Sequence, residues 1–290
     1  MERTYWLHVI SPLHVGAGRG VGHIDLPIVR EKATNWPYVP GSAVKGVIRD
    51  KVENDPLIDV AFGKKDKDRD VDTSAGSLVF SDASIVCLPV RSFYGTFAWL
   101  SSHLALKRLR HLRINDIPTV KETDKVIVMK ENRLSSPDSK KVYFEDIDLT
   151  MEPDATNALE PICRALSGSV FHEERDWQEI FNQRFALVHD DIFSFFCEMG
   201  TEVNARIRIK DEIKTVAKGQ FWYEESLPIE TILSGTVWCD KVWGGSSGGM
   251  TAEKLMDNFC KDPYYDLQIG GKASTGKGRV RCVFSPEVGQ

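Results

Sequence analysis

The chain has 290 residues, of which 42% are hydrophobic and 10% aromatic, enough apolar material for a packed core in one large or two small domains. This composition excludes an intrinsically disordered chain and a collagen-like one. Lys and Arg number 37 and Asp and Glu number 42, so the formal net charge is −5. An acidic total argues at first against a nucleic-acid partner, and the distribution of charge tests that argument.

The charge is divided unevenly along the chain. Residues 138–198 hold 14 acidic and 5 basic side chains, a balance of −9, so the remainder carries +4. The stretches 97–113 and 269–281 contain basic residues and no acidic ones. We therefore expect the basic stretches to contact an anionic ligand, and the acidic block to face solvent or a basic surface of a neighbouring subunit.

The sequence predicts neither a membrane span nor an export signal. No run approaches 18 consecutive apolar residues, and residues 1–11 lack the charged and apolar regions of a secretory signal. The 6 cysteines are far apart, with no C-x-x-C pair. We expect reduced, mostly buried thiols in a cytoplasmic protein, and no structural zinc.

The first predicted element is a strand over Thr4–Ile10, which is rich in β-branched and aromatic residues. After a glycine-dense loop, a helix is predicted to begin at the N-cap residue Ser42, with an apolar stripe at helical spacing. A strand over Leu78–Cys87, broken near Asp82, and a second helix over Phe97–Leu112 follow.

After residue 112 the sequence predicts further strands and helices. Residues 204–215 alternate between apolar and polar side chains, and 219–233 return, which predicts a long hairpin. The other predicted elements are strands over Lys125–Lys130 and Val142–Leu149, a helical stretch over Asp176–Met199, a helix over Ala252–Cys260 and a final strand over Gly278–Phe284. This order predicts an α+β fold with large insertions in a βαβ-type core.

Three segments come close to known nucleotide or calcium motifs but fail in detail. Gly271–Lys277 satisfies most of a P-loop, but Gly278 stands where a hydroxyl must bind Mg²⁺, and a strand follows in place of a helix. The early glycines miss the dinucleotide fingerprint, and the aspartates of 66–72 lack the turn glycine of a calcium loop. No nucleotide cofactor is expected.

The glycine-rich loops can still contact phosphates. Consecutive exposed backbone N–H groups, together with Lys272 and Lys277, would form a nest that favours a phosphate chain. Lys45 and Arg49 lie near the start of the first helix, whose N-terminus is electropositive, and could hold phosphates in the same way.

Several longer motifs are distributed over nearly the whole chain. They are His14-Val-Gly-Ala-Gly18, Gly22-His-Ile-Asp-Leu-Pro-Ile-Val-Arg30, Tyr38-Val-Pro-Gly-Ser-Ala-Val-Lys-Gly-Val-Ile-Arg49 and Ile269-Gly-Gly-Lys-Ala-Ser-Thr-Gly-Lys-Gly-Arg279. In these the chain resembles the RAMP proteins, the RNA-binding subunits of CRISPR effector complexes. Two further motifs resemble more specifically the repeated backbone subunit of the type III-B (Cmr) complex: Phe80-Ser-Asp-Ala83 with Leu88-Pro-Val-Arg91, and Phe221-Trp-Tyr-Glu-Glu-Ser-Leu-Pro228.

The resemblance implies a single RAMP domain over 1–290. Its ferredoxin-like (RRM-like) palm would span about 1–113 and 235–290, with an inserted helical region and a β-hairpin thumb over about 114–234. It also implies that several copies stack along one guide RNA, beside other RAMP subunits, and cleave the paired target RNA. The predicted hairpin falls where the thumb is expected.

The resemblance also implies catalytic residues. Asp25 takes the place of the family's catalytic aspartate, in a glycine-flanked loop that suits close approach to RNA. It could remove the proton from an attacking 2′-OH or hold a Mg²⁺ that neutralises the phosphorane. Without the resemblance, a loop-capping aspartate is the simpler interpretation. His14 could be a general acid or orient the phosphate.

Glu224 is the third catalytic candidate. Adjacent carboxylates on a strand point to opposite faces, so at most one of Glu224 and Glu225 is expected to reach the site. Glu225 is interpreted as a solvated strand end.

Another set of residues is expected to contact guide-RNA phosphates, which requires no base reading. It consists of Ser42, Lys45, Arg49, Gly271, Lys272, Lys277 and Arg279. Phe221, Trp222 and Met250 could stack on displaced bases, although packing explains hairpin aromatics as well.

The sequence thus predicts a guide-RNA-binding backbone subunit that is also an endoribonuclease assisted by Mg²⁺. One alternative is a purely structural guide-binding subunit whose catalytic loop is silent. Another is a ribonuclease that processes guide precursors as a single subunit.

Overall fold

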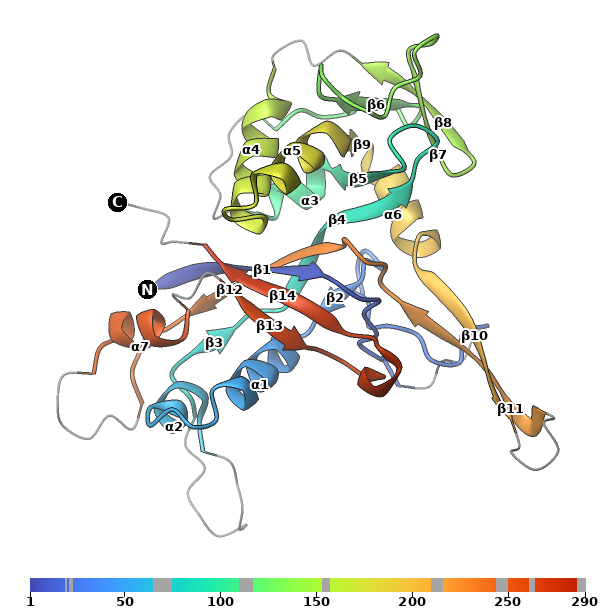
Figure 1. Cartoon of the computed structure of the whole chain (residues 1–290). Coiled ribbons are helices and arrows are strands. Elements are labelled where there is room, and N and C mark those ends of the chain that lie inside the picture. The colour runs from blue at the N-terminus through green and yellow to red at the C-terminus, as the bar shows by residue number, and fades with distance from the viewer. Residues whose placement is uncertain are drawn as a thin grey trace.

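The structure, a computed structural model, describes residues 1–18, 20, 23–64, 75–109, 117–152, 157–209, 216–243, 250–260 and 264–285. One large mixed sheet carries helices on both faces, and a two-stranded hairpin projects away from it (Figure 1). This arrangement confirms the predicted α+β class. Among the described helices, none is long and apolar enough to cross a membrane.

The elements have the following bounds. The strands of the large sheet are β1 (Glu2–Val9), β2 (Tyr38–Val39), β3 (Val79–Phe80), β4 (Ala83–Arg91), β5 (Phe97–Ser102), β6 (Lys125–Val128), β7 (Lys141–Phe144), β8 (Ile147–Glu152), β9 (Phe185–Val188), β12 (Ile232–Trp238), β13 (Tyr265–Gln268) and β14 (Arg279–Phe284). The hairpin consists of β10 (Glu202–Ile209) and β11 (Val216–Ser226). The helices are α1 (Gly41–Lys51), α2 (Ile58–Phe62), α3 (His103–Lys107), α4 (Leu159–Val170), α5 (Arg175–Arg184), α6 (Asp190–Met199) and α7 (Ala252–Phe259).

The sheet brings distant parts of the chain side by side. Its strand order is β13-β14-β1-β12-β4-β5-β9-β6-β8-β7. The β5–β9 and β6–β8 pairs are parallel, and the other neighbours in this order are antiparallel. Because β12 follows the hairpin in sequence and pairs with β1, the base of the hairpin lies beside the loop that follows β1.

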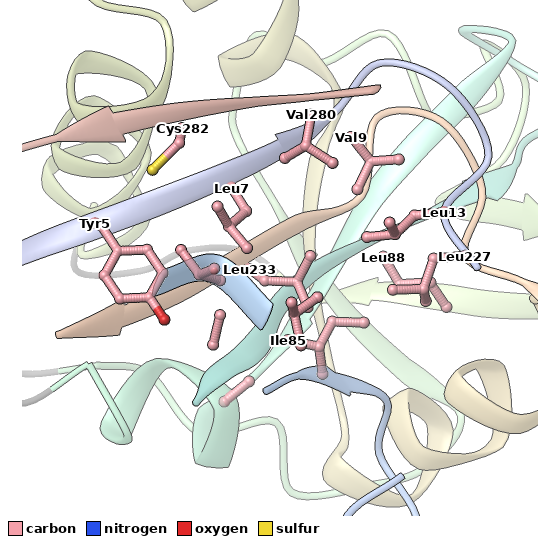
Figure 2. Packing of buried hydrophobic residues seen from close by; sticks show 14 of the residues in the cluster. Tyr5, Leu7, Val9, Leu13, Ile85, Leu88, Leu227, Leu233, Val280 and Cys282 are labelled. Carbon is pink, nitrogen blue, oxygen red and sulfur yellow. The ribbon is translucent and has the colours of Figure 1, made fainter. Parts of the chain in front are cut away.

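Side chains of β1 alternate between two hydrophobic cores, as the two-residue period of a strand requires. Tyr5, Leu7 and Val9 pack into a core that includes residues of α1, α2 and α7, and Figure 2 shows part of this packing. Trp6 packs into a second core with residues of α4 and α5 on the opposite face. Both faces of β1 are therefore closed to solvent.

Most predicted elements are confirmed. They are the first strand, the strand broken near Asp82, the strand near 125–130, the hairpin, the helix over 252–260 and the last strand. The single strand predicted over Val142–Leu149 is wrong, because a turn at Glu145 and Asp146 divides this segment between the antiparallel strands β7 and β8. All 6 cysteines are free and buried, as expected. The predicted arms place the hairpin turn at 216–218, but these residues belong to β11, and the segment between β10 and β11, 210–215, lies outside the described residues. The aspartates of 66–72 also lie outside them. The division into palm and insert stays a prediction, since one sheet runs through both.

The helix predicted over Phe97–Leu112 is wrong in its first half. Residues 97–102 form β5, in which Ala98 and Leu100 face one core and Trp99 faces the other. The helix α3 begins only after Ser102, whose Oγ accepts a hydrogen bond from the Ala105 N–H at 3.3 Å. Two cores on opposite sides favour a strand, even though the leucine spacing fits a helix.

The helical stretch predicted over 176–199 is interrupted by β9, four buried apolar residues that pair with β5 and β6. Four elements, α2, α4, β2 and β13, were not predicted at all. The signal for α4 was present, because Leu159, Ile162, Cys163 and Leu166 recur at helical spacing and are buried.

The predicted N-cap at Ser42 is also wrong. The helix α1 starts at Gly41, after Pro40, and no side chain of the N-cap residue bonds to it. Instead, Asp82 accepts a hydrogen bond from the Gly41 N–H at 2.8 Å, from 41 residues away in the sequence. Gly41 is required here because an added Cβ would lie 2.3 Å from the carbonyl oxygen of Phe80.

We expect Gly235→Ala to lower the free energy of unfolding by about 1–3 kcal/mol, because it overpacks the core. The added methyl would lie 2.5 Å from ring and hydroxyl atoms of Tyr5. Tyr5 is fully buried, and its hydroxyl donates to the Ser81 carbonyl at 2.6 Å, so it cannot move without losing that bond.

The matched control is Gly46→Ala on α1, where nothing lies within 4 Å of the added methyl. It should raise the stability by up to about 1 kcal/mol, the usual gain of alanine over glycine in a helix. Urea unfolding of the two variants measures both effects. Equal midpoints for Gly235→Ala and the wild type would contradict the prediction.

Candidate functional site

Three segments that are distant in sequence meet beside the base of the hairpin. They are the loop over 12–28 after β1, residues 222–227 of β11 and its end, and the glycine-rich loop over 270–278 between β13 and β14. Leu13 forms a β-bridge with Leu227. The Gly271 N–H donates to the His14 carbonyl, and the Gly278 N–H to the Pro12 carbonyl, both at 2.9 Å. These bonds bring several predicted site residues together.

Asp25 is exposed at this meeting point and is held by the hairpin. Its Oδ2 accepts a hydrogen bond from the backbone N–H of Tyr223 at 2.8 Å. The next residue, Leu26, donates its N–H to the Tyr223 carbonyl and accepts at its carbonyl from the Glu225 N–H, both at 3.0 Å. The carboxylate is therefore fixed in place yet open to a ligand.

His14 lies beneath the same loop and is 6% exposed. Its Nδ1 is 2.6 Å from the carbonyl oxygen of Glu225. A carbonyl oxygen can only accept, so Nδ1 carries a proton, and a neutral ring has its lone pair on Nε2. An added Cβ on Gly16 would lie 3.0 Å from that Nε2. Gly16 therefore leaves room above the nitrogen that could exchange a proton.

Glu224 is 3% exposed and surrounded by donors. Lys272 contacts its Oε1 at 2.8 Å and the Trp222 indole N–H donates to the same oxygen at 2.7 Å. Arg206 and Lys277 lie 3.4 and 3.7 Å from Oε2. Burial raises the pKa of Glu224, but the hydrogen bonds of Lys272 and Trp222 and the charges of Lys272 and Lys277 lower it to about 2. At neutral pH this group is a carboxylate.

Glu225 is not the solvated strand end that was expected. It is 2% exposed and forms an ion pair with Arg30 at 2.5 Å. Its carboxylate also accepts from the Ile28 N–H at 3.0 Å and from the Thr201 hydroxyl at 2.9 Å. Glu224 and Glu225 do point to opposite faces of β11, as predicted. Sequence reasoning missed Arg30, because a lone arginine in a loop gives no sign of its partner.

Part of the glycine-rich loop's backbone is engaged within the protein. The N–H groups of Gly271 and Gly278 donate to carbonyls of the loop after β1, and that of Arg279 donates to the Ser11 hydroxyl. The N–H groups of Thr275, Gly276 and Lys277 donate to carbonyls within the loop itself. These bonds close the loop through the amides of Gly271 and of residues 275–279. They do not involve the amides of residues 272–274, where the predicted nest stays a prediction.

The lysines of this loop differ in accessibility. Lys277 is 4% exposed, donates to the Ser226 hydroxyl at 2.7 Å, and has a pKa lowered mainly by burial. The side chain of Lys272 is 32% exposed and also lies 5.8 Å from the centre of the Trp222 ring. Arg279 is exposed at the start of β14. Of the two lysines, Lys272 is the better placed to meet a phosphate.

The candidates on α1 lie apart from this meeting point and have partners elsewhere. Ser42 is exposed. Lys45 donates to the Leu78 carbonyl at 2.8 Å, and burial with the nearby charge of Arg49 lowers its pKa. Arg49 lies 3.3 Å from Asp59. Their predicted contact with guide RNA stays a prediction.

The hairpin has a polar and an apolar face. Trp222 lies on the polar face, where its indole is bonded to Glu224. Phe221 and Tyr223 lie on the other, 51% and 38% exposed and 5.1 Å apart between ring centres. Met250 packs against the core and is partly buried. Of the three predicted stacking residues, Phe221 is therefore the one that the hairpin presents to solvent.

A metal ion at this site would need ligands that the described part of the chain does not supply, such as phosphate oxygens of RNA. Among the described residues, no group of three or more His, Cys, Asp or Glu side chains is placed to hold a metal ion. Glu224 and Glu225 are already paired with cations. Mg²⁺ often uses only one or two carboxylates and takes its remaining ligands from phosphates and water. Asp25 fits that mode.

The chain belongs to the RAMP superfamily, whose model matches residues 6–281. It is 30% identical over 292 residues to the CRISPR system Cmr endoribonuclease Cmr4 of Pyrococcus furiosus, with 96% of this chain and 94% of the relative covered. A crystal structure of oligomeric Cmr4 from Pyrococcus furiosus matches with a TM-score of 0.74 and 25% identity, over 98% of both chains. A chain of the Type III-B Cmr-beta complex bound to cognate target RNA has the same fold, with a TM-score of 0.71 and 20% identity over 98% of this chain and 97% of that one.

We expect Glu224→Gln to destabilise the protein at neutral pH, and the difference from wild type to become smaller in acid. The pKa of this carboxyl in the folded chain, about 2, lies below its ordinary value of 4.5. Its ionised form therefore stabilises the fold above about pH 4.5, and that stabilisation is lost as the pH falls towards 2. The largest effect is up to about 3 kcal/mol.

Urea unfolding at a series of pH values from about 6 to about 3 measures this dependence. Glu122→Gln is the control, because Glu122 is 65% exposed and only 3.9 Å from Lys125, so its removal should change little. A Glu224→Gln deficit that stays constant over the whole pH range would contradict the prediction.

Proposed function

We propose that this chain is a guide-RNA-binding backbone subunit of a type III-B (Cmr) CRISPR effector complex and cleaves the target RNA paired with the guide. The observation that carries the proposal is Asp25, an exposed carboxylate fixed by a backbone N–H at the base of the hairpin. The full-length relative named as an endoribonuclease, and the related complex described as bound to target RNA, support the same activity.

The site can promote attack of a ribose 2′-OH on the adjacent phosphate. Asp25 would accept the hydroxyl proton while the oxygen bonds to phosphorus, and the bond to the 5′-oxygen breaks. His14, when protonated at Nε2, could return a proton to that leaving oxygen. Lys272, held beside the site by Glu224, would stabilise the additional negative charge on the phosphate. Glu224 would thus act by placing a cation.

Mg²⁺ is the proposed cofactor. Asp25 would hold it together with phosphate oxygens of the RNA and water, since this side chain is the exposed carboxylate of the site. When bound, the ion would neutralise charge that develops on the phosphate. Asp25 then has two possible roles, as proton acceptor or as metal ligand, and its removal abolishes both.

The finer description of the fold belongs to this proposal. We assign the sheet around β1, β12, β4 and β14 with α1 and α7 to a ferredoxin-like palm, the region of α4 and α5 to the inserted helical part, and the β10–β11 hairpin to the thumb. Copies of the chain would stack along one guide RNA beside other RAMP subunits in the cytoplasm. The exposed face of Phe221 would stack on displaced bases, and the acidic segment over 138–198 would face away from the guide.

We expect Asp25→Asn, assembled into the complete effector complex, to reduce target cleavage at least about 100-fold, because an amide neither accepts the proton nor binds Mg²⁺ well. Binding of the target should stay within about 3-fold, since the amide keeps the hydrogen bond from Tyr223. Denaturing gels of labelled target RNA, with and without Mg²⁺, measure cleavage. The control is Asp146→Asn in the exposed turn between β7 and β8.

Unchanged cleavage by Asp25→Asn would favour the structural alternative, in which the chain only supports the guide. A discrete product released from a guide precursor by the isolated chain would favour the processing alternative. Each outcome assigns the chain to a different function.

We expect RNA binding to weaken steeply with salt, because phosphate contacts release counterions. Lys272→Met should lower affinity for all guide sequences alike and reduce the slope of log K against log salt by about 1. Filter binding of guide RNA at several salt concentrations measures the slope. The exposed Lys121, before β6, serves as the control through Lys121→Met. If the slope of log K against log salt is equal for Lys272→Met and Lys121→Met, Lys272 makes no phosphate contact.

A further inference from the structure

We propose that Glu225 is a positioning residue for target cleavage: together with Arg30, it holds the Asp25 loop in register against the base of the hairpin. This inference rests on the proposed function, since the reaction it serves is that cleavage. Glu225 and Arg30 would act through Asp25 and His14 and would not touch RNA themselves.

Glu225 contacts both sides of the loop that carries the proposed catalytic groups. Its carboxylate accepts from Arg30 at 2.5 Å and from the Ile28 N–H at 3.0 Å. Its backbone N–H donates to the Leu26 carbonyl at 3.0 Å, and its carbonyl oxygen accepts from His14 Nδ1 at 2.6 Å. One residue therefore sets the position of the segment after Asp25 and the ring orientation of His14.

Arg30 extends this connection to α6. Besides its bond to Glu225, it donates to the Asn35 carbonyl at 2.8 Å and to the Cys197 carbonyl, in α6, at 2.9 Å. Thr201 lies between α6 and β10 and donates to Glu225 at 2.9 Å. The Asp25 loop, α6 and both strands of the hairpin are thus joined at one buried ion pair.

The position of Asp25 depends on this junction. The hydrogen bond that fixes its carboxylate comes from Tyr223, two residues before Glu225 on β11. A shift of the loop relative to β11 would lengthen that bond and move the carboxylate away from the 2′-OH. Misplacement of a reacting group by about 1 Å can cost about 100-fold in rate.

The chemistry of the pair suits a positioning role better than a direct one. The Glu225 carboxylate has three donors and is 2% exposed, so no oxygen is presented to a ligand. A buried ion pair is weak support for stability, because desolvation offsets the attraction, while its geometry is specific. Replacing either partner should therefore affect the arrangement of the loop more than the binding of RNA.

The test uses the complete effector complex assembled with guide RNA and a Glu225→Gln subunit. The amide keeps the shape but turns one acceptor into a donor, which then faces the N–H and hydroxyl donors of Arg30, Ile28 and Thr201. We expect the single-turnover cleavage rate to fall at least about 10-fold, with target affinity changed less than about 3-fold. The midpoint of the pH–rate profile should not move, since Glu225 does not exchange the proton.

Two further variants support the comparison. Asp257→Asn removes a carboxylate on α7 that is paired with Arg3 at 2.5 Å, where Arg3 also donates to two backbone carbonyls. This pair lies at the start of β1 and not at the Asp25 loop, so the variant should cleave at the wild-type rate. Thr201→Val removes one hydroxyl donor to Glu225 and no charge, and should lower cleavage about 3-fold. If the Glu225→Gln subunit does not assemble into the complex, the cleavage rate of the Thr201→Val complex tests the proposal in its place.

Wild-type cleavage by Glu225→Gln, or by Thr201→Val in its place, would overturn the proposal. Equal losses of target binding and cleavage would also overturn it, because they indicate a merely structural pair. A shifted pH midpoint would assign Glu225 to proton transfer instead. By contrast, a wild-type complex that binds target RNA without cutting it would refute the proposed function itself, which separates the two failures.

Discussion

The site depends on a short parallel pairing between residues 25–28 and the base of β11. A two-stranded hairpin leaves the outer edge of each strand without a partner, and backbone groups on such an edge need one. In this chain the loop after β1 occupies the edge of β11 through the Leu26–Glu224 bridge. Asp25 is consequently placed relative to the hairpin. The glycine-rich loop and β1 place the backbone of His14, while its ring is bonded to the Glu225 carbonyl of the hairpin. The relative position of Asp25 and His14 therefore depends on how the hairpin is held against the sheet.

The two-residue period of β11 gives its neighbouring glutamates different environments. Glu224 faces Arg206, Lys272 and Lys277, while Glu225 faces Arg30. Because Glu202 also lies near Lys277, the first cluster has three cations for two carboxylates and keeps a small positive excess, which would attract phosphate. The second is a single balanced pair. The net charge counts both glutamates as groups that repel RNA. Neither side chain is exposed, however, and Glu224 holds the ammonium of Lys272 close to the site.

Local alternation explains which parts of the fold could be predicted. Tyr5–Val9 and the hairpin were assigned correctly because their patterns depend only on near neighbours. The segment 97–102 was misassigned because Leu100 and Leu104 fit helical spacing, and only the second core beyond Trp99 favours a strand. The Arg30–Glu225 pair joins residues 195 positions apart in the sequence, so no local sequence pattern predicts it. Asp25 was named through the resemblance to RAMP proteins, and spacing alone would have left it as a loop cap. His14 and Glu224 were named because they lie beside that loop and on the predicted hairpin.

The glycine-rich loop has a structural part as well as the predicted binding part. The amides of Gly271 and of residues 275–279 close the loop and hold the segment around His14. What the loop presents is Lys272, at φ +69°, a left-handed conformation that costs a residue other than glycine about 1 kcal/mol. The contact of its ammonium with Glu224 at 2.8 Å offsets that cost. Lys272 thus adopts a left-handed conformation in which its ammonium contacts Glu224 at the base of the hairpin.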